Sequence, residues 1–314
     1  MMTRVDCARW LQEHDDYLIL THRRPDGDTL GSSATLCMGL RKMGKRAYIL
    51  NNPEITPKYT HLHQGLTKPA AEEHDTVISV DVAAPHMLPD SFFPLLDRLA
   101  LRIDHHYSAD SFAPNELVDH TAAACGEIVY DVLRILEIPL DKPMAEALYT
   151  AVSTDTGCFR YSNTTAHTLQ TAAACYETGA ELYPINLSLF DSNSHGRLRL
   201  QGWMAENTRL IAGGKLAICA LPRKVEEDLG LTEDDLENVS GFPRSIEGVK
   251  MAATLRESAD GVKISVRAVP GYDAAAVCQK FGGGGHKGAA GAGTDLPLAA
   301  AAKAVEKVML EVAL

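Results

Sequence analysis

No apolar run in this sequence approaches the roughly 20 residues that a membrane-spanning helix needs. The first residues, from Met1 to Asp6, also lack the hydrophobic stretch of a secretion signal. Both absences argue against insertion into a membrane or passage across one. We therefore expect a cytoplasmic protein without a membrane partner.

Paired cysteines are also missing. The seven cysteines are an odd number, are widely scattered, and form no Cys-x-x-Cys motif. A disulfide framework or a structural zinc site would need closely and regularly spaced cysteines. The pattern therefore indicates reduced thiols, most of them buried.

The sequence has no excess of positive charge, since its formal net charge is −11. A protein that holds long nucleic acid neutralises many phosphates with lysine and arginine side chains. The acidic balance therefore argues against long nucleic acid as a partner. If the substrate carries phosphate, a small substrate is favoured.

Short apolar runs alternate with helical patterns in the first half of the chain. This alternation predicts an α/β domain with a mostly parallel sheet and helices on both faces. The predicted strands are Tyr17–Thr21, Ala47–Asn51, Thr76–Asp81 and Leu99–Asp104, and the predicted helices are Thr29–Gly44, Leu117–Ile138 and Pro143–Ser153.

A turn-like segment near Asp191 indicates a boundary between two domains. We expect a first domain over 1–190, a helical linker over 191–207, and a smaller α/β domain with a mixed sheet over 208–314. In the smaller domain a hairpin around Gly213-Gly214 and two alternating strands precede two helices; the ranges are Arg209–Ile211, Lys215–Leu221, Val249–Arg256, Gly261–Ala268, Tyr272–Phe281 and Pro297–Val312.

Acidic and histidine side chains follow three of the predicted strands. Ligands bind outside the carboxyl ends of strands in open α/β sheets, so we expect these side chains to share one edge. Imidazoles with carboxylates suit a divalent ion such as manganese. Two histidines and four aspartates form a candidate two-metal site in which one aspartate is shared, with Asp104 as a carboxylate that orients a ligating imidazole. The candidates are His22, Asp26, Asp28, Asp81, Asp155 and one of the adjacent His105 and His106.

A glycine-rich segment from Phe281 to Gly291 is the second strong signal. It contains Gly282 to Gly285 followed by His286 and Lys287. A flexible linker is the simpler interpretation, but backbone amides without side chains can also approach a phosphate closely. We favour a phosphate-binding loop, to which His286 and Lys287 add charge.

Two other patterns carry no functional prediction. The segment Gly39–Arg46 fits a phosphate-loop spacing, but it ends a helix and has Arg46 where a hydroxyl would hold magnesium. His61-Leu62-His63 has metal-like spacing in a polar loop without acidic neighbours. We expect both histidines to be solvated.

Together these motifs resemble the DHH phosphoesterase superfamily, which is named for the triplet found here as Asp104-His105-His106. The turn from Thr21 to Asp28, Val80-Asp81, and Ser153–Gly157 match further motifs of that family. The glycine-histidine segment resembles the associated DHHA1 domain. Nearly the whole chain is covered, and the likeness is greatest to the nanoRNase/pAp phosphatase branch.

The resemblance implies specific roles in the first domain. One metal ion would be held by His22, Asp26 and Asp81, and the other by Asp28, Asp81, His105 and Asp155. His106 would face the scissile phosphate as an electrophile or proton donor. Asn163, from the same loop as Asp155, is a weaker candidate for substrate contact.

In the second domain, the resemblance assigns the substrate's terminal phosphate to Arg267, Gly283, Gly284, Gly285 and His286. Ala268 stands where the family usually has serine, which removes one minor contact. The implied reaction is attack on phosphorus by a metal-bridging hydroxide. The implied substrates are short oligoribonucleotides, cut to mononucleotides, and 3′-phosphoadenosine 5′-phosphate (pAp), cut to AMP.

Several alternatives share these metal motifs. They are a RecJ-like exonuclease on longer strands, a family II inorganic pyrophosphatase, and a hydrolase of cyclic or linear dinucleotides. A non-catalytic nucleotide sensor is a further alternative, although the full set of six ligands argues against it. The sequence leaves open the polarity of attack, the metal used in the cell, and the oligomeric state, with a homodimer among the choices.

Overall fold

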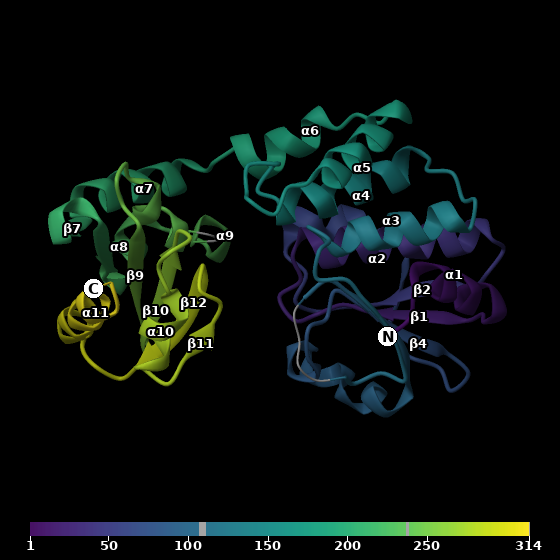
Figure 1. The fold of residues 1–314 in the computed structure, drawn as a ribbon, viewed down its shortest axis with the longest axis horizontal. Coiled ribbons are helices and arrows are strands. Elements are labelled where there is room, and N and C mark those ends of the chain that lie inside the picture. The colour runs from purple at the N-terminus through teal and green to yellow at the C-terminus, as the bar shows by residue number, and fades with distance from the viewer. Residues whose placement is uncertain (107–110, 237–238, 314) are drawn as a thin grey trace. The chain divides into compact units, whose positions relative to one another are not determined.

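The computed structural model describes residues 1–106, 111–236 and 239–313. It divides into two compact units, Met1–Ser192 and Asn193–Leu314 (Figure 1). Each unit has its own sheet and its own core. None of the described helices is both long and apolar enough to cross a bilayer.

The first unit is built on a parallel sheet with strand order β3-β2-β1-β4-β5-β6. The predicted α/β class with a mostly parallel sheet is therefore confirmed. Its strands are β1 (Tyr17–Leu20), β2 (Ala47–Leu50), β3 (Thr67–Lys68), β4 (Thr76–Val80), β5 (Leu99–Asp104) and β6 (Asn115–Val118). Its α-helices are α1 (Arg4–Glu13), α2 (Gly27–Lys42), α3 (Cys125–Ile135), α4 (Lys142–Asp155), α5 (Ala166–Glu177) and α6 (Tyr183–Asn186).

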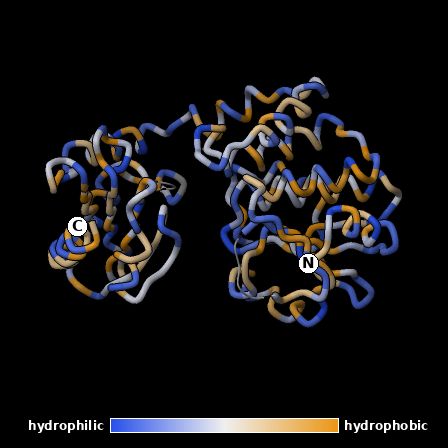
Figure 2. Tube along the Cα trace, viewed as in Figure 1, coloured by the Kyte–Doolittle hydropathy of each residue, from blue (hydrophilic) through white to orange (hydrophobic). Residues whose placement is uncertain are grey.

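The sheet of this unit is buried on both faces, as β1 shows. Tyr17 and Ile19 pack with residues of α1, α2 and α3, whereas Leu18 and Leu20 pack with the 3-10 segment η3 (Asp90–Arg98). The sequence of such a strand is a continuous apolar run, because alternate side chains enter two different cores. Figure 2 shows apolar residues along these central strands and hydrophilic residues in the outer loops.

The prediction of one helix over Leu117–Ile138 is wrong at its start. Leu117 lies in β6, paired with Ile103 of β5, and the helix α3 begins only at Cys125. The turn between them is fixed by Asp119, whose carboxylate accepts hydrogen bonds from the backbone and hydroxyl of Thr121. A strand this short cannot be told from a helix by apolar periodicity.

Helices α2 and α4 cross at very short range. An added Cβ at Gly31 would lie 2.3 Å from the carbonyl oxygen of Ala147, and one at Gly27 would lie 2.4 Å from the Oγ1 of Thr154. Small residues let two helix backbones approach in this way. The crossing brings the first turn of α2 against the last turn of α4.

The second unit has a mixed sheet with strand order β11-β12-β10-β9-β8-β7, as predicted. The β8–β9 pair is parallel and its other pairs are antiparallel. The strands are β7 (Arg209–Ile211), β8 (Leu216–Leu221), β9 (Met251–Ser258), β10 (Gly261–Ala268), β11 (Gly284–Gly285) and β12 (Ala289–Thr294). The helices are α7 (His195–Asn207), α8 (Arg223–Leu229), α9 (Glu233–Leu236), α10 (Ala274–Gln279) and α11 (Leu298–Val312).

Helix α7 covers most of the segment predicted as a linker. It buries Leu200 and Met204 against Cys219 and Leu221 of β8. Because this face belongs to the core of the second unit, the helix is part of that unit rather than a free connection.

Candidate metal centre

The carboxyl ends of β1, β4 and β5 carry polar side chains to one place, as the strand-end argument predicted. His22 follows β1 and directs its Nε2 atom toward two carboxylates. The distance is 3.6 Å to Oδ1 of Asp26 and 3.8 Å to Oδ2 of Asp81. These three residues offer ligand atoms close enough to surround one ion.

A second group lies beside the first. Nε2 of His105 is 3.7 Å from Oδ2 of Asp28, 3.4 Å from Oδ2 of Asp155, and 3.6 Å from Oδ1 of Asp81. Asp28, His105 and Asp155 could hold another ion. Asp81 faces both groups, with Oδ2 toward His22 and Oδ1 toward His105.

Helix ends position two of these carboxylates. Asp28 lies in the first turn of α2 and Asp155 is the last residue of α4, so the close crossing of these helices brings them together. The carboxylate of Asp28 also accepts hydrogen bonds from the backbone N–H groups of Cys125 (2.6 Å) and Gly126 (3.0 Å), at the start of α3. A helix N-terminus favours a negative charge.

Asp81 adopts an uncommon backbone conformation, with φ of +60°. Aspartate tolerates this left-handed region better than most residues, and such conformations cluster at functional sites. The turn directs the Asp81 side chain across the end of the sheet. Its backbone N–H still donates to the carbonyl of Ile103, at 2.9 Å.

The donor atoms fit divalent cations. Nδ1 of His22 lies 2.7 Å from the carbonyl of Arg23, and Nδ1 of His105 lies 3.2 Å from that of Ala122. Each Nδ1–H donates to its carbonyl. The Nε2 atom of each ring therefore keeps a free lone pair, which is the usual arrangement of a ligating histidine. Within the described part of the chain, Nε2 of His105 and Oδ1 of Asp81 are buried without a hydrogen-bond partner. Such unpaired atoms are costly unless a cation occupies the site.

Carboxylates this close together resist ionisation. Burial raises the pKa of Asp28, and burial together with the charge of Asp28 raises the pKa of Asp81 well above its usual value. For Asp155, burial and the charges of Asp28 and Asp26 raise the pKa to about 8. A cation between these groups would relieve the repulsion.

Metal binding should therefore release protons and strengthen with pH. Below about pH 8 the carboxyl group of Asp155 retains a proton that a cation must displace, so we expect the affinity for Mn²⁺ to rise up to roughly tenfold per pH unit below that value. Calorimetric titration of Mn²⁺ in buffers of different ionisation enthalpy measures the protons released. Equal release at about pH 7 and about pH 9 would contradict this assignment.

Neighbouring carboxylates favour the protonated form of His106. Burial acts to lower its pKa, but the hydrogen bond to Asp104 and the charges of Asp81 and Asp104 outweigh it and raise the pKa to about 11. Its Nδ1–H donates to Oδ1 of Asp104 at 2.9 Å. The carboxylate of Asp104 thus orients His106, whereas the Ala122 carbonyl orients His105.

Arg102 supports this carboxylate and escaped the sequence analysis. It is fully buried, ion-pairs with Asp104, and donates to the carbonyls of Val82 (3.0 Å) and Ala83 (3.2 Å). Hydrogen bonds from His106 and Arg102 outweigh the burial of Asp104 and lower its pKa to about 2. The available signal was an arginine inside an apolar strand, two residues before Asp104.

Comparison with known proteins agrees with this geometry. Residues 16–152 match the model of the DHH family, N-terminal domain, and residues 213–311 match that of the DHHA1 domain. A bifunctional oligoribonuclease and PAP phosphatase NrnA of Thermus thermophilus is 33% identical over 277 residues, which is 87% of this chain and 82% of that protein. The chain belongs to the DHH family.

Another sequence relative and one solved structure extend the likeness. A bifunctional oligoribonuclease and PAP phosphatase NrnA of Bacillus subtilis is 27% identical over 302 residues, 92% of both chains. The crystal structure of an exopolyphosphatase-related protein from Bacteroides fragilis has a TM-score of 0.88 at 23% identity. It covers 98% of this chain and 96% of that protein, which shows the same fold.

In the DHH domain, Asn163 is engaged with backbone groups. Its Nδ2 donates to the carbonyls of Ala123 (3.2 Å) and Asp155 (3.1 Å). The side chain thus ties the end of α4 to the loop before α3. This contact supports the position of Asp155, and the predicted contact with substrate stays a prediction.

In the DHHA1 domain, Arg267 and His286 lie on opposite sides of β12, both next to Ala289. Ala289 of β12 pairs with Arg267 of β10 and exchanges backbone hydrogen bonds with His286 on its other side. Directly paired residues point to the same face of a sheet, so both side chains share a face. Their role in phosphate binding stays a prediction.

The glycines beside His286 have packing reasons of their own. A Cβ at Gly283 would lie 2.2 Å from the carbonyl oxygen of Gly291, and one at Gly285 would lie 2.6 Å from Cα of Ala290. Gly284 faces open space. Close approach of β11 to β12 therefore explains two of the three glycines predicted to bind phosphate.

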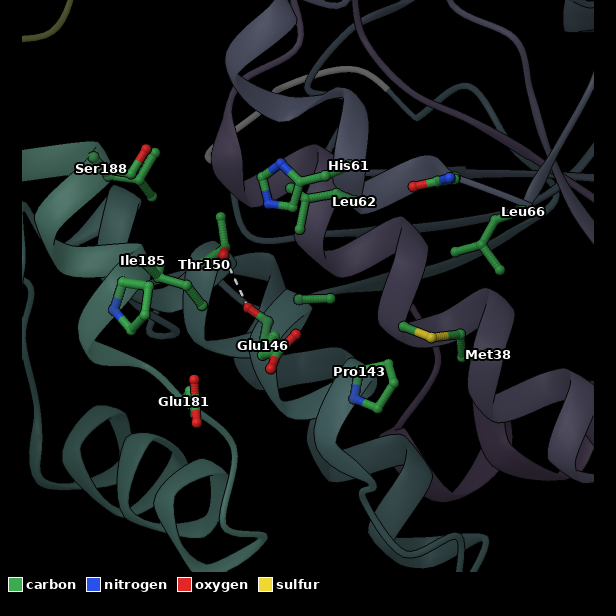
Figure 3. Close-up of a pocket in the computed structure, with 14 residues that line it drawn as sticks. Met38, His61, Leu62, Leu66, Pro143, Glu146, Thr150, Glu181, Ile185 and Ser188 are labelled. Atoms are coloured by element: carbon green, nitrogen blue, oxygen red, sulfur yellow. Dashed lines mark hydrogen bonds between the residues drawn. The ribbon is translucent and has the colours of Figure 1, made fainter.

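A cavity of about 430 Å³ lies elsewhere in the DHH domain (Figure 3). Its walls are largely apolar, including Met38, Leu62 and Ile185, and its polar residues include Glu146 and Glu181. None of the six candidate metal ligands lines it. We assign it no part in the reaction.

The prediction that His63 is solvated is wrong. Its side chain is buried, with Nε2 3.0 Å from Oγ of Ser33 and 3.2 Å from the carbonyl of Leu30. Burial, partly offset by the hydrogen bond to Leu30, lowers the pKa of His63 to about 4, so this histidine is neutral. A 3-10 turn, η1 (Pro57–His63), folds the apparently polar segment back onto α2.

Proposed function

We propose that the chain is a two-metal phosphoesterase that hydrolyses short oligoribonucleotides to mononucleotides and pAp to AMP. The observation that carries the proposal is Asp81, whose two carboxylate oxygens face two separate groups of histidine and aspartate. Relatives named as bifunctional oligoribonuclease and PAP phosphatase support the substrates. Both substrates are phosphate esters of short nucleotides.

The donor set favours manganese. His22 with Asp26 and Asp81, and His105 with Asp28, Asp81 and Asp155, mix imidazole nitrogen with carboxylate oxygen, which suits ions of intermediate hardness. Two divalent cations held there would activate water for attack and stabilise the charge on the phosphate oxygens.

The chain's own residues would orient the phosphate and stabilise its charge. The Nδ1–H of His106 is fixed on Asp104, which holds the ring in one orientation and favours its protonated form, so its Nε2–H could donate to a phosphate oxygen. A donor fixed before the reaction costs no reorganisation as charge develops on that oxygen. The Asp104–Arg102 ion pair holds this arrangement in the interior.

Charge supports the preference for short substrates. The net charge of −11 offers little attraction to a long polyanion, so binding must rely on local phosphate contacts. We propose Arg267 and the hairpin at His286 for one such contact. A cytoplasmic location accords with the free cysteines that the described residues contain.

The test is a time course with Mn²⁺ on 5′-labelled RNA from dinucleotides to strands of about 20 nucleotides, with pAp in parallel. Rapid loss of the shortest RNAs and phosphate release from pAp support the proposal. Processive shortening of the long strand would instead indicate a RecJ-like exonuclease. Absence of turnover on every substrate would overturn the proposed activity.

Replacing Arg267 by alanine should weaken substrate binding without affecting the metal centre. Loss of one charged phosphate contact should raise KM for pAp roughly tenfold, with kcat and metal content unchanged. Lys263→Ala is the matched control, because Lys263 lies on the same face of β10 and is exposed. Loss of bound metal in Arg267→Ala would contradict this division of roles.

A further inference from the structure

A polar cavity of about 590 Å³ lies at the end of β2 in the DHH domain and adjoins the cavity of Figure 3, with which it shares His61 and Gln64. We call it the Asn51 cavity; its lining includes Asn51, Asn52, Thr60, His61, His63 and Gln64. Its volume is within the range of pockets for small organic ligands. Like the metal centre, it is built at the carboxyl end of a strand, where α/β sheets bind ligands.

Hydrogen bonds join one wall of this cavity to the metal centre. Nδ2 of Asn52 donates to the carbonyl of His22 and to Oγ1 of Thr21, both at 2.9 Å. The next loop residues add a second link, since the backbone N–H of Arg24 donates to Oε2 of Glu54 at 3.1 Å. A group in the cavity would therefore lie beside the loop that carries His22.

The side chains of the cavity offer hydrogen bonds that the protein does not use. Asn51 and Gln64 are exposed, and no described residue pairs with either side-chain amide. His63 is buried, and its Nδ1 has no hydrogen-bond partner among the described residues. An unpaired buried acceptor is unfavourable, and a ligand or water with a donor would satisfy it.

Charge distinguishes this cavity from the one in Figure 3. No carboxylate lines the Asn51 cavity, whereas Glu146 and Glu181 line the other and would repel a nucleotide. The Asn51 cavity thus combines neutral hydrogen-bonding groups with direct attachment to the His22 loop.

We propose that the Asn51 cavity binds the base of the nucleotide whose phosphate lies at the metal centre, an inference that rests on the proposed function. Asparagine and glutamine amides present a donor beside an acceptor, and every base has an edge that matches such a pair. Because an amide can turn over to exchange its donor and acceptor, the cavity accepts different bases. This tolerance suits an enzyme for short RNA of any sequence and for pAp.

The test compares a substrate that has a base with one that lacks it. The double variant Asn51→Ala/Gln64→Ala should raise KM for pAp roughly tenfold with kcat nearly unchanged, because two base contacts are lost. It should leave KM for ribose 3,5-bisphosphate, which has no base, unaltered. Gln170→Ala, an exposed amide of α5, is the matched control.

Equal changes in KM for both substrates, or none for pAp, would overturn the proposal while leaving the phosphoesterase activity intact. Binding of AMP by calorimetry provides a readout that needs no turnover. Weaker AMP binding by the double variant supports the base site even if the proposed activity fails. Unchanged AMP binding overturns it.

Discussion

Replacing Asp81 by asparagine is expected to lower kcat/KM by more than about 100-fold, because disturbing even an indirect partner of a metal ligand costs 10–100-fold. Asp81 faces both His22 and His105, so one substitution affects both candidate ion sites. Asparagine keeps the side-chain shape and tolerates the φ of +60° at this position. The loss should therefore reflect ligand chemistry rather than misfolding.

The measurements for Asp81→Asn are steady-state kinetics with Mn²⁺ and the metal content after dialysis. Asp97→Asn is the control, since Asp97 is an exposed acid of the same unit and lies outside the site. Activity near that of the unmodified protein would show that Asp81 is not the shared ligand. A folded variant with low activity and reduced metal content is the expected result.

Replacing Arg102 by methionine is expected to destabilise the first unit by about 3–5 kcal/mol, the usual cost of removing one partner from a buried ion pair. Both partners are buried, and Arg102 also donates to two backbone carbonyls. Methionine fills similar space but leaves Asp104 as a buried charge with His106 as its remaining charged partner. The same change frees the carbonyls of Val82 and Ala83.

Urea denaturation measures the stability of the Arg102→Met variant, with Arg9→Met as a control on an exposed arginine of α1. Adding Asp104→Asn to Arg102→Met should restore part of the lost stability, because the buried charge that has lost Arg102 is then removed. If the second substitution only adds to the loss, the Arg102–Asp104 pair is not the source of the effect.

The strand-end part of the candidate metal centre was predictable because it is local in sequence. His22, Asp81 and His105 follow three apolar strands, and parallel strands end at the same edge of the sheet. That argument needs no knowledge of how distant helices pack. The fold class followed from the same alternation of strands and helices.

Features that depend on distant packing were missed or mistaken. The hydrogen bonds from the start of α3 to Asp28, the burial of His63 against α2, and the hydrogen bonds from Arg102 to two backbone carbonyls depend on tertiary contacts. The β6 strand was also wrongly included in a longer predicted helix, because only its pairing with β5 makes it a strand. The periodicity of apolar residues in the sequence does not identify such partners.

The glycine segment shows a different limit. Its composition predicts close approach of the backbone, and that approach is present, but at Gly283 and Gly285 it is to β12 of the same sheet. A glycine pattern indicates that something lies near the backbone without identifying what it is.

The short-range crossing of α2 and α4 has a consequence for folding kinetics. Asp28 and Asp155 come together only when Gly27 and Gly31 lie against α4, so the ion site that includes His105 is complete only after these helices dock. A cation cannot favour a transition state in which its ligands are still apart. Bound metal should therefore slow unfolding and leave the folding rate nearly unchanged.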